Sequence, residues 1–272
     1  MRPVVFLLAS HGLAGDPWFY WVIRALNAHP EIYAYFGEST RSKYFHERSR
    51  KERPDVIEFV KWLKDVGSQF RAVGDCYAYR SYQLEALWDV YGEEVRWVNL
   101  VRHPFCWLGY YTDWRAVYNV GAPPENTSAL EHEWSVTCHD EIKKYGLLPY
   151  SYKDVHIWAF YQGLIILNRM VSDRRTGVRN IRVEELVSNR TTFVGLVRYL
   201  THGEIDYPTE LLDTIYSWVF KPFREDIIIR ADPEAEYLNW PDWKKEAFAK
   251  VVKPEALETF KKHGYSFEVA GL

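Results

Sequence analysis

A glycine-bearing turn near the N-terminus has the residue types of an anion-binding site. It follows a continuous apolar run, Val4 to Ala9, and reads Ser10-His11-Gly12-Leu13-Ala14-Gly15. Asp16 then stands at the N-cap position, and Pro17 at the first position, of a predicted helix. In such a unit, unpaired backbone N–H groups and the positive helix end point at one place, which favours an anion such as a nucleotide phosphate. Many strand–turn–helix connections bind nothing, so both interpretations stay open.

A second group of charged residues is the polar, strongly basic stretch STRSKYFHERSRKER, residues 39–53. If the stretch forms a lid, its Arg and Lys side chains would meet an anionic ligand. A solvated loop or helix face explains the same composition and is the simpler interpretation.

Alternating strand and helix patterns predict the elements that position these residues. Strands are predicted at 4–9, 32–36, 70–73, 94–102 and 179–183, and helices at 18–28, 55–67, 79–91, 105–117, 153–171, 185–200 and 254–263. The segment 121–152 is predicted to be irregular. This order favours an α/β fold of three layers, in which helices flank a central, mostly parallel sheet. Without a repeat or a clear linker, residues 1–272 are predicted to form a single domain.

The composition narrows the class of protein. A net charge of −3 argues against non-specific nucleic-acid binding. The three cysteines show no metal-binding spacing, which favours a reducing compartment, and we expect a cytoplasmic protein. No apolar run is long enough for a membrane span, and the first apolar run is read as a strand rather than a leader. The aromatic content of 17% is compatible with a cleft for flat or sugar-like ligands.

Four segments of the chain carry a family resemblance. They are the opening unit with its helix ending in His29-Pro30 and the following Gly37-Glu38, then Gly74-Asp75-Cys76, Trp97 to Pro104 (WVNLVRHP), and Ile181 to Val187 (IRVEELV). Taken in order, they resemble the sulfotransferases that use 3′-phosphoadenylyl sulfate (PAPS). The C-terminal stretch from Leu257 to Gly264-Tyr265 also fits. The resemblance implies a P-loop-like architecture over most of the chain.

The resemblance also implies roles for individual residues. The nucleotide would be held by Ser10, His11, Gly12, Gly15, Arg102 and Tyr110, with Arg102 gripping the 3′-phosphate through a bidentate fork. Glu38, or alternatively His11, would be the base that accepts the proton of the acceptor hydroxyl. Arg41 would meet the sulfuryl oxygens or an anionic acceptor. PAPS is then the co-substrate, 3′-phosphoadenosine 5′-phosphate (PAP) the product and a small molecule or carbohydrate the acceptor, without a metal.

The chain departs from the family pattern at the phosphate contacts. Counted back from His29, Asp16 occupies the place of the family's phosphate-binding cation, and a carboxylate there repels phosphate. His11, if protonated, would replace that cation. Tyr110 stands where the family has a Ser, and Cys76 where it has a Lys. Three outcomes follow: a divergent sulfotransferase, a relative with another donor, or a binding module without catalysis.

Other enzyme classes lack their motifs in this sequence. The Gly-x4-Gly-Lys-Ser/Thr string of nucleotide kinases and the Gly-x-Ser-x-Gly string of α/β-hydrolases are both missing. The group of His132, His139 and neighbouring carboxylates has no metal-site spacing and is read as a solvated loop.

Overall fold

The computed structural model describes residues 3–10, 16–35, 60–61, 63–65, 67–76, 91–118, 155–169, 178–221 and 228–272. The chain divides into two compact units. Unit 1 contains 1–12, 17–101 and 173–229, and unit 2 contains 13–16, 102–172 and 230–272. The single domain therefore stays a prediction, and each unit is described by itself.

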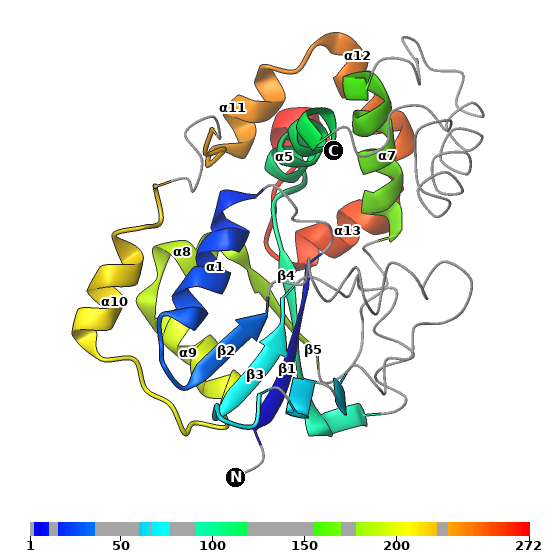
Figure 1. Cartoon of the computed structure of the whole chain (residues 1–272). Helices are drawn as coiled ribbons and strands as arrows, with labels where there is room; N and C mark the ends of the chain where they lie inside the picture. The colour runs from blue at the N-terminus through cyan, green and yellow to red at the C-terminus, as the bar shows by residue number, and fades with distance from the viewer. Residues whose placement is uncertain are drawn as a thin grey trace. The chain divides into compact units, whose positions relative to one another are not determined.

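Unit 1 is built on a parallel sheet. Its strands in the described residues are β1 (Val4–Ser10), β2 (Ile32–Tyr35), β3 (Ala72–Asp75), β4 (Val95–Val101) and β5 (Val178–Arg182). Their order is β2-β3-β1-β4-β5, and all four neighbouring pairs run parallel (Figure 1). Residues 5–8 of the central β1 are at most 1% exposed, as expected for a strand covered on both faces. The predicted α/β class is confirmed.

Helices flank this sheet within unit 1. They are α1 (Pro17–Asn27), α8 (Val183–Ser188), α9 (Arg190–Leu200) and α10 (Thr209–Tyr216), and the short 3₁₀ turn η3 (Gly92–Glu94) precedes β4. The first helix begins at Pro17, as the sequence predicts. Tyr207 fixes its other end, because the Tyr207 hydroxyl donates to the carbonyl oxygens of Ala25 at 2.8 Å and Leu26 at 3.0 Å. The Trp21 indole donates to the Ile215 carbonyl at 2.7 Å, which ties α1 to the end of α10.

Two predictions about unit 1 need correction. The strand predicted at 70–73 is found at Ala72–Asp75, so Gly74 belongs to β3 rather than to the turn after it. A Cβ on Gly74 would overlap the ring and the carbonyl oxygen of Phe6 in β1, so only glycine fits there. The helix predicted at 185–200 is two helices, because Asn189 caps α9 by accepting from the backbone N–H of Thr191 at 2.9 Å and of Thr192 at 3.3 Å.

Unit 2 is helical in its described residues. It contains α5 (Pro104–Tyr118), α7 (Val155–Arg169), α11 (Pro233–Leu238), α12 (Asp242–Val251), α13 (Pro254–Lys262) and the 3₁₀ turn η6 (Glu268–Ala270). Phe105 lies at the centre of an aromatic core, with its ring 4.6 Å from that of Tyr237 and 5.1 Å from that of Phe248. Gly163 of α7 packs on Leu108 of α5, where a Cβ would come within 2.7 Å of the leucine side chain. Within the described ranges, no helix is long and apolar enough to cross a membrane.

Candidate functional site

The carboxyl ends of β1 and β4 form the topological switch point of the sheet. These strands are neighbours, with Ser10 paired in register to Leu100. The chain leaves β1 towards β2 on one side of the sheet and leaves β4 towards β5 on the other. In open α/β sheets, ligands bind in the crevice where the connections diverge in this way. In the sheet of unit 1, a ligand is therefore expected to bind next to the residues at the carboxyl ends of these two strands.

Arg102, the residue that follows β4 in the chain, forms a buried ion pair with Asp16 in unit 2. The Arg102 Nε lies 2.7 Å from the Asp16 Oδ2, and the two side chains are 1% and 0% exposed. A second guanidinium nitrogen, Nη2, donates to the backbone carbonyl of Arg230 at 2.5 Å. Burial removes the solvent screening that weakens surface ion pairs, so the attraction between these two charges is strong.

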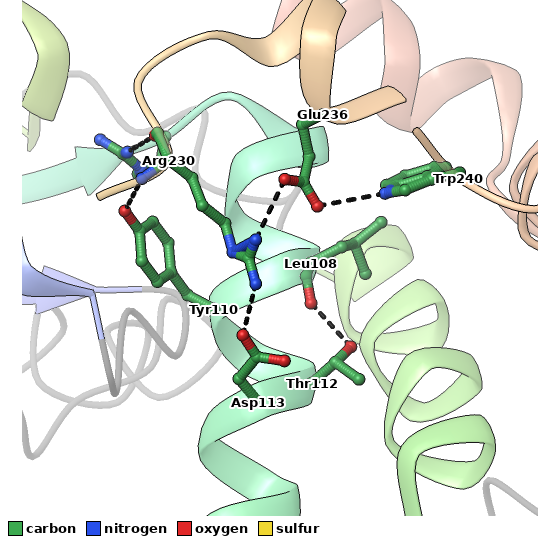
Figure 2. Close-up of polar contacts among 8 residues, drawn as sticks. Leu108, Tyr110, Thr112, Asp113, Arg230, Glu236 and Trp240 are labelled. Atoms are coloured by element: carbon green, nitrogen blue, oxygen red, sulfur yellow. Dashed lines mark hydrogen bonds and ion pairs between the residues drawn. The ribbon is translucent and has the colours of Figure 1, made fainter. Parts of the chain in front are cut away.

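Tyr110 of α5 lies beside the same guanidinium. Its ring centroid is 5.3 Å from the Cζ of Arg102 and 5.6 Å from that of Arg230. Its hydroxyl accepts a hydrogen bond from the backbone N–H of Arg230 (Figure 2). Burial, followed by the Asp16 carboxylate, raises the pKa of Tyr110 above its ordinary value, although Arg102 and the Arg230 amide act against the rise. Tyr110 therefore stays a neutral phenol and does not serve as a base near neutral pH.

The side chain of Arg230 is held by two carboxylates. Its guanidinium is paired with Asp113 of α5 and, at 3.1 Å, with Glu236 of α11, and the Trp240 indole donates to Glu236 at 3.3 Å (Figure 2). Burial lowers the pKa of Arg230, but Asp113 and Glu236 outweigh it, so the net shift is upward. This arrangement, the Arg230 clamp, fixes the backbone groups of Arg230 that contact Arg102 and Tyr110.

The absence of a side chain at Gly109 leaves room for the side chains of Arg230 and Glu236 in the clamp. A Cβ at Gly109 would lie 2.7 Å from the Arg230 Nε and 2.8 Å from the Glu236 Oε1. Gly109→Ala is therefore expected to lower the free energy of unfolding by about 1–3 kcal/mol through overpacking, despite the higher helix propensity of alanine. Urea unfolding measures the change.

The matched control is Gly195→Ala in α9, where a Cβ meets nothing within 4 Å. That variant is expected to gain about 0.5–1 kcal/mol from helix propensity alone. A Gly109→Ala protein as stable as the Gly195→Ala protein would contradict the tight packing of the clamp.

The structure brings together two of the residues predicted for the site, Arg102 and Tyr110. Ser10 is the last residue of β1. The other predicted site residues, His11, Gly12, Gly15, Glu38 and Arg41, lie outside the described residues, as do the basic stretch 39–53 and His132 and His139.

The sequence analysis missed the residues of the Arg230 clamp. Arg230 is 128 positions from Arg102, and Asp113 and Glu236 belong to different helices. One local signal was available: Asp232-Pro233 follows Arg230, and this pair begins α11 with an Asp cap and a Pro in the first turn.

No family model matches the chain, and no curated protein matches it. The sulfotransferase domain from the curacin biosynthetic pathway is similar over 98% of this chain and 99% of its own, with 13% identity and a TM-score of 0.37. A sulfotransferase from Alicyclobacillus acidocaldarius is similar over 87% and 99%, with 14% identity and a TM-score of 0.41.

A third similar structure is the sulfotransferase domain from the Synechococcus PCC 7002 olefin synthase, over 98% of this chain and 96% of that one, with 14% identity and a TM-score of 0.37. All three are sulfotransferases. At these identities the likeness concerns the fold alone.

Proposed function

We propose that the protein transfers a sulfuryl group from PAPS to a hydroxyl or amine of a small-molecule or carbohydrate acceptor. The observation that carries the proposal is the buried guanidinium of Arg102, directly after β4, the strand beside β1 at the switch point of the sheet. The four sequence segments that resemble sulfotransferases support it, since one of them contains this arginine. The cytoplasm stays the proposed compartment, because the buried free thiol of Cys76 suits a reducing environment.

Sulfuryl transfer asks a protein mainly to hold and orient charged groups, because the bound donor supplies the activated sulfuryl group. Arg102 would hold the 3′-phosphate, and Tyr110 would support the guanidinium through its ring. Ser10, His11, Gly12 and Gly15 would approach the 5′ end of the nucleotide. Glu38, or His11, would take the proton of the acceptor, and Arg41 would face the acceptor side.

The described residues fit the donor in one respect and not in another. A buried arginine directly after β4 in the chain matches a phosphate in charge and in fork geometry. The Asp16 carboxylate does not fit the donor, because it is an anion that already contacts the guanidinium to which the phosphate of the donor would bind. This ion pair favours a second candidate function, a donor-switched or catalytically inactive binding module of the same fold.

Addition of PAP is expected to raise the melting temperature of the protein. A ligand that binds only the folded state stabilises it by about 2.7 kcal/mol at a concentration of roughly 100 Kd. For a chain of this size that corresponds to a rise in Tm of roughly 5–10 °C. Differential scanning fluorimetry measures the shift, and adenosine 5′-phosphate, which lacks the 3′-phosphate, is the matched ligand and is expected to give a smaller one.

Activity is tested separately, by incubation with PAPS and a panel of hydroxyl and amine acceptors, followed by mass spectrometry for the added SO₃ group. Product together with a PAP shift supports the transferase. A PAP shift without product on any acceptor supports the binding module. No shift at millimolar PAP would remove PAPS as the donor.

A further inference from the structure

The buried ion pair of Asp16 and Arg102 restricts how an anionic ligand can bind to Arg102. The Arg102 side chain is 1% exposed and the Asp16 side chain 0% exposed, with 2.7 Å between Nε and Oδ2. An anion that comes to Arg102 from solvent therefore cannot simply add to an open face. To accept from the Arg102 Nε, it has to take the position that the carboxylate holds.

Two further contacts of Arg102 keep the guanidinium in place. The Arg230 carbonyl accepts from Nη2 at 2.5 Å, and the Tyr110 ring lies 5.3 Å from Cζ. The Arg230 carbonyl is in turn fixed by the clamp through Asp113 and Glu236. These contacts do not involve Asp16, so they orient the cation whether or not the carboxylate is present.

We propose that Asp16 is an internal counter-ion that occupies the phosphate-binding face of Arg102 and must leave before a phosphate binds there. In this role Asp16 determines ligand specificity, since it sets the affinity of the site for a 3′-phosphorylated nucleotide. The proposal rests on the proposed function in one respect only, the identity of the nucleotide. Two anions on one desolvated guanidinium repel each other, so the carboxylate and the phosphate exclude one another.

The expected result is a gain of binding when the carboxylate is removed. Asp16→Asn keeps the size of the side chain and a neutral acceptor, and Asp16→Ser keeps a residue type suited to the N-cap position before α1. Both variants are expected to bind PAP about tenfold more tightly or better than the native protein, since like charges in contact are costly. Loss of folding or of packing does not produce such a gain.

Three measurements by isothermal titration calorimetry make the test specific. PAP, adenosine 5′-phosphate and inorganic phosphate are each titrated into the native protein, both single variants and the double variant Asp16→Asn/Arg102→Gln. The gain in PAP affinity should be lost in the double variant. The gain in affinity for adenosine 5′-phosphate should be smaller than the gain for PAP. Asp206→Asn is the matched control, because its partner Arg198 is 62% exposed and its own side chain is 73% exposed.

A thermal readout covers variants that are too unstable for calorimetry. Asp16→Asn leaves a buried guanidinium without its carboxylate, so its Tm is expected to fall and to recover on addition of phosphate. The recovery should exceed the phosphate effect on the native protein and on the double variant.

The outcomes separate this inference from the proposed function. If neither single variant binds PAP or phosphate more tightly than the native protein, and phosphate does not restore the Tm, the counter-ion role is wrong. If the variants gain phosphate binding through Arg102 but no form of the protein binds PAP, the counter-ion role stands and the PAPS-dependent function falls. If the single variants gain PAP binding and the double variant does not, both stand.

Discussion

Arg102→Gln is expected to be among the most destabilising single substitutions in this chain, with a loss of about 3–5 kcal/mol in the free energy of unfolding. The substitution removes the guanidinium and leaves the Asp16 carboxylate, which is 0% exposed, without its charged partner. It also removes the donor that the Arg230 carbonyl accepts from. A buried, uncompensated charge costs far more than the net contribution of the intact pair, which explains the size of the effect. Chemical denaturation monitored by tryptophan fluorescence measures the loss.

Two further variants control this prediction. Arg198→Gln breaks an exposed pair with Asp206 and is expected to change stability by less than about 1 kcal/mol. Asp16→Asn/Arg102→Gln removes both charges, so it should recover much of the stability lost in the single variant and allow its PAP binding to be measured. A single Arg102→Gln variant as stable as Arg198→Gln would show that the buried pair is weak. PAP binding by the double variant as tight as that of the Asp16→Asn single variant would exclude Arg102 as the phosphate ligand.

Phe105→Ala is expected to have a comparable effect, a loss of about 3–5 kcal/mol, because it opens a cavity at the centre of unit 2. The Phe105 side chain is 0% exposed. Its ring centroid lies 4.6 Å from that of Tyr237, 5.2 Å from that of Trp240 and 5.5 Å from that of Phe267. Aromatic pairs of this kind contribute beyond their buried area, so truncation removes several favourable contacts at once.

The control for this substitution is Phe220→Ala. The Phe220 side chain is 72% exposed, so its removal should change stability by no more than about 0.5 kcal/mol. Thermal unfolding of the two variants under identical conditions measures the difference. A Phe105→Ala protein that melts together with Phe220→Ala would contradict the central place of Phe105 in the core of unit 2.

Local patterns in the sequence were sufficient for most of the elements. The apolar run at 4–9 and the Pro17 start of α1 appear in the structure close to where they were predicted, because buried parallel strands and helix starts have short-range signatures. The two errors are local as well. Asn189 is a strong cap residue within an apparently continuous helical pattern, and Gly74 was read as a turn residue although it lies in a strand. Gly74 fits there only because of Phe6 in β1, a contact that no local pattern shows.

For the site, the sequence predicted residues and not their partners. Arg102 and Tyr110 were predicted through the family resemblance, and Asp16 was recognised as a carboxylate in the place of a cation. That the guanidinium of Arg102 is paired with this carboxylate, 86 positions earlier in the chain (102 minus 16), could not be derived from spacing. The sequence predicted repulsion between Asp16 and a phosphate, and the structure adds the cation that both would share.

The amino-acid sequence was enough to predict the α/β class and the approximate position of each described strand, because hydrophobic periodicity and turn residues act over a few neighbouring positions. The strand order and the contacts of Arg102 with Asp16, Tyr110 and Arg230 could be read only from the folded chain. These contacts join segments far apart in the chain. The sequence contains all of the charged residues involved, but how the whole chain packs determines which of them form buried ion pairs. Burial strengthens the attraction within such a pair.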